Sequence, residues 1–229
     1  MSAFTAFEER IGHEFRDERL LQTACTHRSY LNENRAPGRE HNERLEFLGD
    51  AVLELAVTDF LFKRFPEKPE GELTMYRAAL VNTVSISDAA QKLGMNDFLL
   101  LSRGEARDTG RARAIILANA FEAVIGAIYL DAGYDAAQAF IARQLFGKTD
   151  EVIEKRLWQD AKSRFQELAQ ERVGITPSYQ LLHHVGPDHA RTFTVGVFLA
   201  AERIATGEGK SKQEAEQQAA EKALEARGW

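Results

Sequence analysis

The spacing of apolar residues changes once along this chain, near residue 160. From Phe4 to about Lys155, apolar residues recur every three or four positions, and no run alternates as a β-strand does. The expected helices cover residues near 4–12, 17–25, 41–65, 72–94, 97–102, 115–132 and 135–156, with breaks at "FPEKPEG" and "GEARDTGRAR". Residues 1–156 are therefore predicted to form an all-α domain.

Residues 160–229 follow a different pattern. A helix over 163–173 ends before Pro177, and three runs rich in β-formers follow: "YQLLHHV", "RTFTVGVFL" and "ERIATGEG". In the middle run every second residue from 193 to 199 is apolar, which is typical of a half-buried strand. With the closing helix, this predicts a small α+β domain of order α-β-β-β-α, separated from the first near residues 156–160.

Composition limits the class of protein. Charged residues at Glu8, Glu9 and Arg10 stand where a signal peptide needs an apolar run, so we expect a cytoplasmic protein with no membrane segment at this end. The only cysteine, Cys25, allows no intrachain disulfide and is expected to be buried. A net charge of −6 argues against a general nucleic-acid binder, although an acidic metal site would distort that average.

The segment "NERLEFLGDAVLEL", residues 42–55, concentrates like charges on one side of a helix. At about 100° per residue, four acids fall in one narrow stripe, while an apolar set is expected opposite. The acids are Glu43, Glu46, Asp50 and Glu54, and the apolar set is Leu45, Leu48, Val52 and Leu55. Like charges at this spacing repel, so something must compensate for them unless the stripe is simply a solvated face.

A second unusual segment is "AIILANAFEAVIGAIYL", residues 114–130, in which Glu122 is the only charge. The run is marginally short for a membrane helix and carries a carboxylate at its centre, so a buried core helix fits better. A lone buried carboxylate must be paired, protonated or metal-bound. The sequence leaves pairing open, because arginines are available at positions 44, 77, 111 and 113.

The two segments together suggest a metal site. Glu46 and Asp50 are four residues apart on one helix, and Asn119 and Glu122 are three apart on another. Four oxygen donors from two helices of a bundle suit a hard cation such as Mg²⁺.

"NERLEFLGDAVLEL" closely resembles the signature block of the ribonuclease III family. "THRSY" (26–30), "PEGELTMYRAALVN" (69–82) and "ILANAFEAVIGAIYLDAGY" (116–134) resemble the family's other conserved segments, in the same order. The C-terminal unit resembles the double-stranded RNA-binding domain that bacterial members carry there. The resemblance covers nearly the whole chain.

The resemblance implies roles for the acids. Glu46, Asp50 and Glu122 take the positions of metal-binding acids, with Asp50 and Glu122 catalytic, and Glu43 and Glu70 match supporting acids beside the cleft. The family's fourth metal-binding acid would fall on position 119, where this chain has Asn119. An amide oxygen still coordinates Mg²⁺ but brings no charge, so we expect weaker ion binding in an active enzyme.

The resemblance also implies an activity and an assembly. The expected protein is a Mg²⁺-dependent endoribonuclease, with Mn²⁺ able to substitute, that cuts double-stranded RNA in rRNA and mRNA precursors. It would leave 5′-phosphate and 3′-hydroxyl ends with short 3′ overhangs. The family works as a homodimer, in which Phe47 matches an aromatic that packs into the partner; an ordinary core phenylalanine is the alternative.

In the C-terminal unit, the resemblance assigns RNA contacts to both ends of the domain. Gln166 and Glu167 on the first helix and His189 in the loop "GPDH" match minor-groove contacts, and Lys210, Ser211 and Lys212 match the phosphate-binding start of the last helix. Ser211 and Glu214 also form a capping-box pattern. Residues 160–229 hold 9 Lys and Arg against 10 Asp and Glu, so we expect modest, salt-dependent RNA affinity.

Three alternatives remain open from the sequence. A non-enzymatic duplex-RNA binder could keep the fold and lose turnover through Asn119. The helical domain could be an unrelated metal enzyme acting on nucleotides, and the small domain could serve protein contacts.

Overall fold

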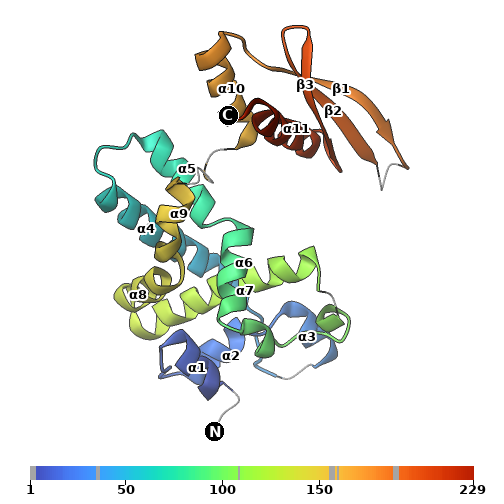
Figure 1. The fold of residues 1–229 in the computed structure, drawn as a ribbon. Coiled ribbons are helices and arrows are strands. Elements are labelled where there is room, and N and C mark those ends of the chain that lie inside the picture. Colours follow the sequence, from blue (N-terminus) through green and yellow to red (C-terminus); the bar gives the residue numbers. More distant parts are fainter. Residues whose placement is uncertain (1–3, 35–36, 108, 155–157, 159, 188–190) are drawn as a thin grey trace. The chain divides into compact units, whose positions relative to one another are not determined.

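The computed structural model describes the chain except for residues 1–3, 35–36, 108, 155–157, 159 and 188–190. Two compact units divide it, Met1–Trp158 and Gln159–Trp229 (Figure 1). Each has its own hydrophobic core. The predicted fold class, an all-α domain followed by an α-β-β-β-α domain, is confirmed.

The first unit is built from helices. Its α-helices are α1 (Thr5–Ile11), α2 (Glu18–Ala24), α3 (Arg28–Glu33), α4 (Glu43–Arg64), α5 (Glu70–Leu80), α6 (Thr83–Lys92), α7 (Arg111–Ala132), α8 (Tyr134–Leu145) and α9 (Thr149–Glu154). Short 3₁₀ turns are η1 (Met95–Asp97), η2 (Glu105–Arg107) and η3 (Phe146–Lys148).

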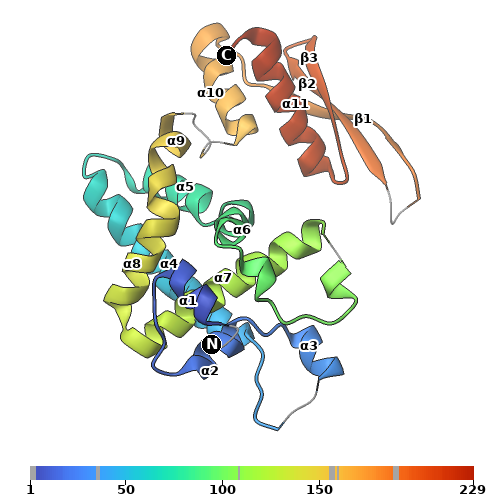
Figure 2. The ribbon, with the colours of Figure 1, turned by 60° about the horizontal axis from the view of Figure 1, so that its bottom comes forward.

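Helix α7 is the centre of this unit. It packs against α2, α4, α6 and α8 (Figure 2), and its longest contact is with α4. The helix has the length and hydropathy of a membrane span, yet eleven of its residues, among them Phe121 and Ile125, are buried. This burial on every side explains its continuous apolar sequence and confirms its prediction as a core helix.

Several expected helix boundaries were wrong, because capping and tertiary contacts override apolar spacing. The helix expected over 72–94 is two helices, since the Asn82 side chain accepts a hydrogen bond from the Ser85 amide (2.9 Å) and caps a new start. The expected helix over 97–102 is absent: Leu100 instead pairs with the main chain beside Thr26. The helix expected over 135–156 divides into α8, η3 and α9, and α3 was not predicted.

The buried face of α4 is also rotated from the expected one. Leu45 and Val52 are buried as predicted, but Leu55 is 57% exposed and Leu53, which is not in the expected apolar set, is 1% exposed. Helix α7 approaches α4 at Gly49, which shifts the buried face toward Leu53.

The second unit contains α10 (Ala161–Val173), β1 (Ser178–Val185), β2 (Thr192–Leu199), β3 (Glu202–Gly209) and α11 (Lys212–Arg227). The strands form an antiparallel sheet in the order β1-β2-β3, and α11 packs on β2, β3 and α10. Val195, Val197 and Leu199 are buried, as the alternation predicted. Gly207 lets α11 approach, because a Cβ there would overlap the main chain of Ala215 and Ala219.

Candidate active site

Two glycines set the distance between α4 and α7. A Cβ added at Gly49 would overlap the main-chain carbonyl of Glu122, and one at Gly126 would overlap the carbonyl of Leu45. The two backbones are therefore in direct contact, which only glycine at these positions allows. This close approach brings side chains of both helices near the crossing to the same cleft.

An open cleft of about 640 Å³ lies at this crossing. It is lined by His27, Arg28, Asn42, Glu43, Glu46, Phe47, Asp50, Ile115, Ile116, Asn119 and Glu122. All four predicted oxygen donors thus share one cleft, together with Glu43.

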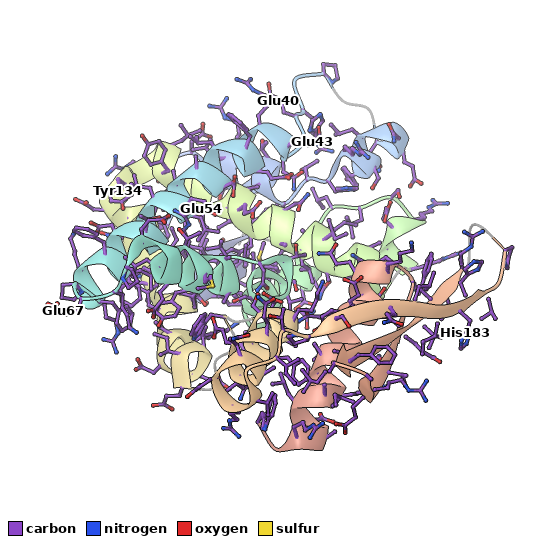
Figure 3. The ribbon with its side chains drawn as sticks, turned by 90° about the horizontal axis from the view of Figure 1, so that it is seen from above. Glu40, Glu43, Glu54, Glu67, Tyr134 and His183 are labelled. Atoms are coloured by element: carbon purple, nitrogen blue, oxygen red, sulfur yellow. The ribbon has the colours of Figure 1, made fainter. Side chains whose placement is uncertain are left out.

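Two other acids do not belong to it. Glu70 begins α5, where it accepts a hydrogen bond from the Thr74 hydroxyl (2.9 Å), and it is not among the lining residues. Glu54 pairs with Arg77 instead (Oε2–Nε 2.8 Å). Figure 3 shows Glu43 near the start of α4 and Glu54 further along it. The acidic stripe seen in the sequence is therefore split between a cleft and an ion pair.

Burial and neighbouring acids disfavour ionisation in the cleft. Burial, followed by the charges of Asp50, Glu46 and Glu54, raises the pKa of Glu122 to about 7. Burial and then Glu43 also raise the pKa of Glu46, and Asp50 adds to this, whereas a hydrogen bond from the Asn119 side chain opposes it. A cation among these groups would relieve the repulsion.

Arginine does not neutralise Glu122 in the described part of the chain, where none of the ion pairs involves that residue. Arg77 is engaged with Glu54, and the Arg113 guanidinium donates to the main-chain carbonyl of Glu105 (2.8 Å). The structure therefore gives the ion-pair alternative no support at Glu122.

The donor set fits a hard divalent cation. Three carboxylates and one amide offer only oxygen, the ligand that Mg²⁺ prefers. Within the ranges that the structure describes, no group of three or more Asp, Glu, His or Cys side chains is placed to hold a metal ion. Mg²⁺ is usually held by only one or two carboxylates and keeps several of its own waters.

Sequence reasoning missed the part of the cleft contributed by the "THRSY" segment. His27 caps α3: its Nδ1 accepts from the Ser29 amide (3.3 Å) and lies 2.8 Å from the Ser29 hydroxyl. Burial lowers the pKa of His27. Its neighbour Arg28 reaches Glu43. The segment's match to the family was the only sequence signal for this wall.

Phe47 is 83% exposed, so its interpretation as a core phenylalanine is wrong. Along α4 it is followed by Leu55 (57% exposed) and Phe62 (70% exposed), which lie within about 80° of it around the helix. Together these three side chains form an exposed apolar strip beside the acids.

Those residues assigned to RNA binding that the structure describes are exposed on the second unit. Gln166 and Glu167 lie on α10 and line a shallow hollow. Ser211 caps α11 by accepting from the Glu214 amide (3.1 Å), and the Glu214 carboxylate accepts from the Lys210 amide (2.8 Å). Capping therefore occupies the amides of Glu214 and Lys210. His189 lies outside the described residues.

Comparison with known proteins agrees with this architecture. The Ribonuclease-III-like family matches residues 17–149, and the double-stranded RNA binding motif matches residues 161–226. A Ribonuclease 3 from Pelotomaculum thermopropionicum is 47% identical over 220 residues, covering 96% of this chain and 91% of that protein.

Two solved structures resemble the helical unit. The nuclease domain of ribonuclease III from Campylobacter jejuni has a TM-score of 0.56 and 40% identity, covering 69% of this chain and 99% of that one. A second structure of that domain (TM-score 0.55, 41% identity, 62% and 97% covered) is described by its flexibility in a region involved in dimer formation. The chain belongs to the ribonuclease III family and is an endoribonuclease that carries a C-terminal double-stranded RNA-binding motif.

Proposed function

We propose that this protein cleaves double-stranded RNA in a Mg²⁺-dependent reaction, leaving 5′-phosphate and 3′-hydroxyl ends with short 3′ overhangs. The observation that carries the proposal is the meeting of Glu46, Asp50, Asn119 and Glu122 in one cleft at a glycine-mediated helix crossing. The RNA-binding motif on the same chain supports duplex RNA as the substrate.

The four donors would hold Mg²⁺, with Mn²⁺ as a substitute. When bound, such an ion would shield phosphate charge and lower the pKa of the attacking water. The Asn119 amide NH₂ would donate to the Glu46 carboxylate, and its oxygen would then be left for the cation. The raised pKa of Glu122 favours its protonated carboxyl in the absence of metal, and the group must release that proton to act as a ligand. Asp50 and Glu122 are the proposed catalytic acids.

The proposed assembly is a homodimer that joins two such clefts. The apolar strip of Phe47, Leu55 and Phe62 supports it, as large exposed apolar side chains in a row mark interaction surfaces. The dimer-forming region described for the Campylobacter relative supports it as well. Glu43 is the proposed supporting acid of the cleft that it lines. Glu70 is also proposed as a supporting acid, but it does not line the cleft of its own chain.

The second unit would deliver the duplex. Gln166, Glu167 and His189 are the proposed minor-groove contacts, and Lys210, Ser211 and Lys212 the proposed phosphate contacts. Processing of rRNA and mRNA precursors in the cytoplasm, with no membrane association, is the proposed setting.

A gel assay of a labelled long RNA duplex, with Mg²⁺ or with Ca²⁺, tests the proposal. We expect short duplex products with Mg²⁺ only, and no cutting of a single strand of the same sequence. Turnover of free nucleotides without cleavage of the duplex would contradict the proposed substrate.

Asn119→Asp separates the enzyme from a non-enzymatic binder, an alternative that the relatives do not favour. The added carboxylate should lower the Mg²⁺ concentration for half-maximal rate, because a charged ligand binds the cation more tightly. An unchanged Mg²⁺ requirement would remove Asn119 from the cation site. Binding without cutting by both proteins at every Mg²⁺ concentration would identify a binder.

A further inference from the structure

We infer that Arg28 binds a backbone phosphate of the RNA at the mouth of the cleft, and that Glu43 holds its guanidinium there until the phosphate replaces it. This inference rests on the proposed function. Of the side chains that line the cleft, Arg28 is the permanent cation. His27 is the other basic group, and burial lowers its pKa.

The negative charge of the cleft opposes the binding of RNA, so a basic side chain at its mouth would favour binding. Four carboxylates line the cleft, from Glu43, Glu46, Asp50 and Glu122, and each phosphate of a nucleic acid adds one negative charge. A cation held in the cleft would offset the charge of the phosphate next to it. A neighbouring phosphate at the mouth still meets the field of the acids, and a guanidinium fork matches the phosphate oxygens in shape and charge.

The Arg28 side chain is available for exchange. Its Nη1 lies 3.4 Å from Glu43 Oε1, a long contact, and the two side chains are 71% and 48% exposed. Exposed pairs of this kind contribute little, so a phosphate can displace the carboxylate at small cost.

The backbone that carries Arg28 is fixed on both sides. The His27 amide donates to the Leu100 carbonyl (3.0 Å), and the Asn42 amide donates to the Thr26 carbonyl (2.9 Å), which ties the starts of α3 and α4 together. The Ser29 hydroxyl also accepts from the Ser102 amide (3.1 Å). The main chain at Arg28 therefore has a fixed position relative to the start of α4, where Glu43 lies. In addition to capping α3, the "THRSY" segment positions this arginine.

The test compares Arg28→Gln, Arg28→Lys and the control Arg19→Gln, which removes an exposed guanidinium paired with Asp17 outside the cleft. For Arg28→Gln we expect the KM for duplex cleavage to rise about tenfold with kcat nearly unchanged, as removal of one charge-assisted hydrogen bond from the complex predicts. The slope of log affinity against log salt, measured in Ca²⁺, should become shallower by about 0.9, the amount expected when the protein neutralises one phosphate fewer. Arg28→Lys should keep the slope, and Arg19→Gln should change neither quantity.

Each outcome supports or contradicts the proposed role of Arg28. If Arg28→Gln leaves both KM and the salt slope at the wild-type values, Arg28 merely neutralises Glu43 and the inference fails. Glu43→Gln provides a second measurement: freeing the guanidinium should lower KM, and a raised KM would contradict the exchange. Failure of the wild-type protein to cleave in Mg²⁺ would overturn the proposed function alone, since the salt slope of binding still decides the role of Arg28.

Discussion

At the scale of single residues, Glu122 is the acid of the site whose ionisation is most strongly disfavoured by burial and by neighbouring charges. Its carboxyl is partly buried next to Asp50 and Glu46, and its pKa is raised to about 7 from an ordinary value of 4.5. In the metal-free protein the folded state therefore binds more protons than the unfolded chain between these two values, and stability falls as pH rises through that window.

The raised pKa predicts how the stability of Glu122→Gln depends on pH. Relative to wild type, the variant should gain up to about 3 kcal/mol of unfolding free energy between pH 4.5 and pH 8 in the presence of a chelator, because it has no charge to bury. Urea unfolding at the two pH values measures the difference, with the exposed Glu9→Gln as the control. A constant difference between variant and wild type would show that Glu122 ionises normally. The variant should also lose cleavage.

At the scale of secondary-structure elements, the crossing of α4 and α7 determines the site. Gly49→Ala should cost at least about 2 kcal/mol and most of the activity, because its Cβ would push the Glu122 carbonyl away and separate the donors. Gly71→Ala is the matched control: this exposed helical glycine has no atom near its Cβ position, so alanine should be neutral or stabilising by up to about 1 kcal/mol. Equal stability of the two variants would contradict direct backbone contact.

The sequence predicted the long elements better than their ends. Helix α4 and strand β2 followed from periodicity, because burial on one face imposes a regular spacing, whereas α7 followed from its long apolar run and the other strands from their β-forming residues. Periodicity did not predict the break at Asn82, because that break depends on a side-chain cap. It also did not predict the pairing of Leu100 with the chain beside Thr26, because that segment is far away in sequence. The expected burial of Leu55 failed for a similar reason: the neighbour at Gly49, rather than the pattern, sets the buried face.

For the site, spacing within each helix placed Glu46 with Asp50 and Asn119 with Glu122. Periodicity could not say that the two pairs share a cleft; the four oxygen donors suggested it, and the resemblance to the family strengthened that expectation. Arg28 was not predicted, because a lone arginine in a short helix has no pattern to mark it. Glu70 was expected beside the cleft by position in a conserved block, but α5 carries it elsewhere.

At the scale of the whole molecule, the exposed strip of Phe47, Leu55 and Phe62 predicts self-association. Phe47→Asp should turn a dimer into a monomer in sedimentation-velocity runs at micromolar concentration, because a charge would be buried without a partner. Val173→Asp, which alters an exposed apolar residue of the second unit, should leave the dimer intact. A monomeric wild-type protein, or a Phe47→Asp variant that remains dimeric, would contradict this use of the strip.

Donors from α4 and α7 together are proposed to hold the divalent cation, and the rest of the mechanism depends on this. The most direct measurement is the increase in melting temperature that Mg²⁺ produces in the metal-free protein at pH 8. At twenty times its dissociation constant the ion should stabilise wild type by about 1.8 kcal/mol, a rise of roughly 5 °C, and Glu122→Gln should show much less. The same rise in both proteins would place the cation away from this cleft and contradict the account.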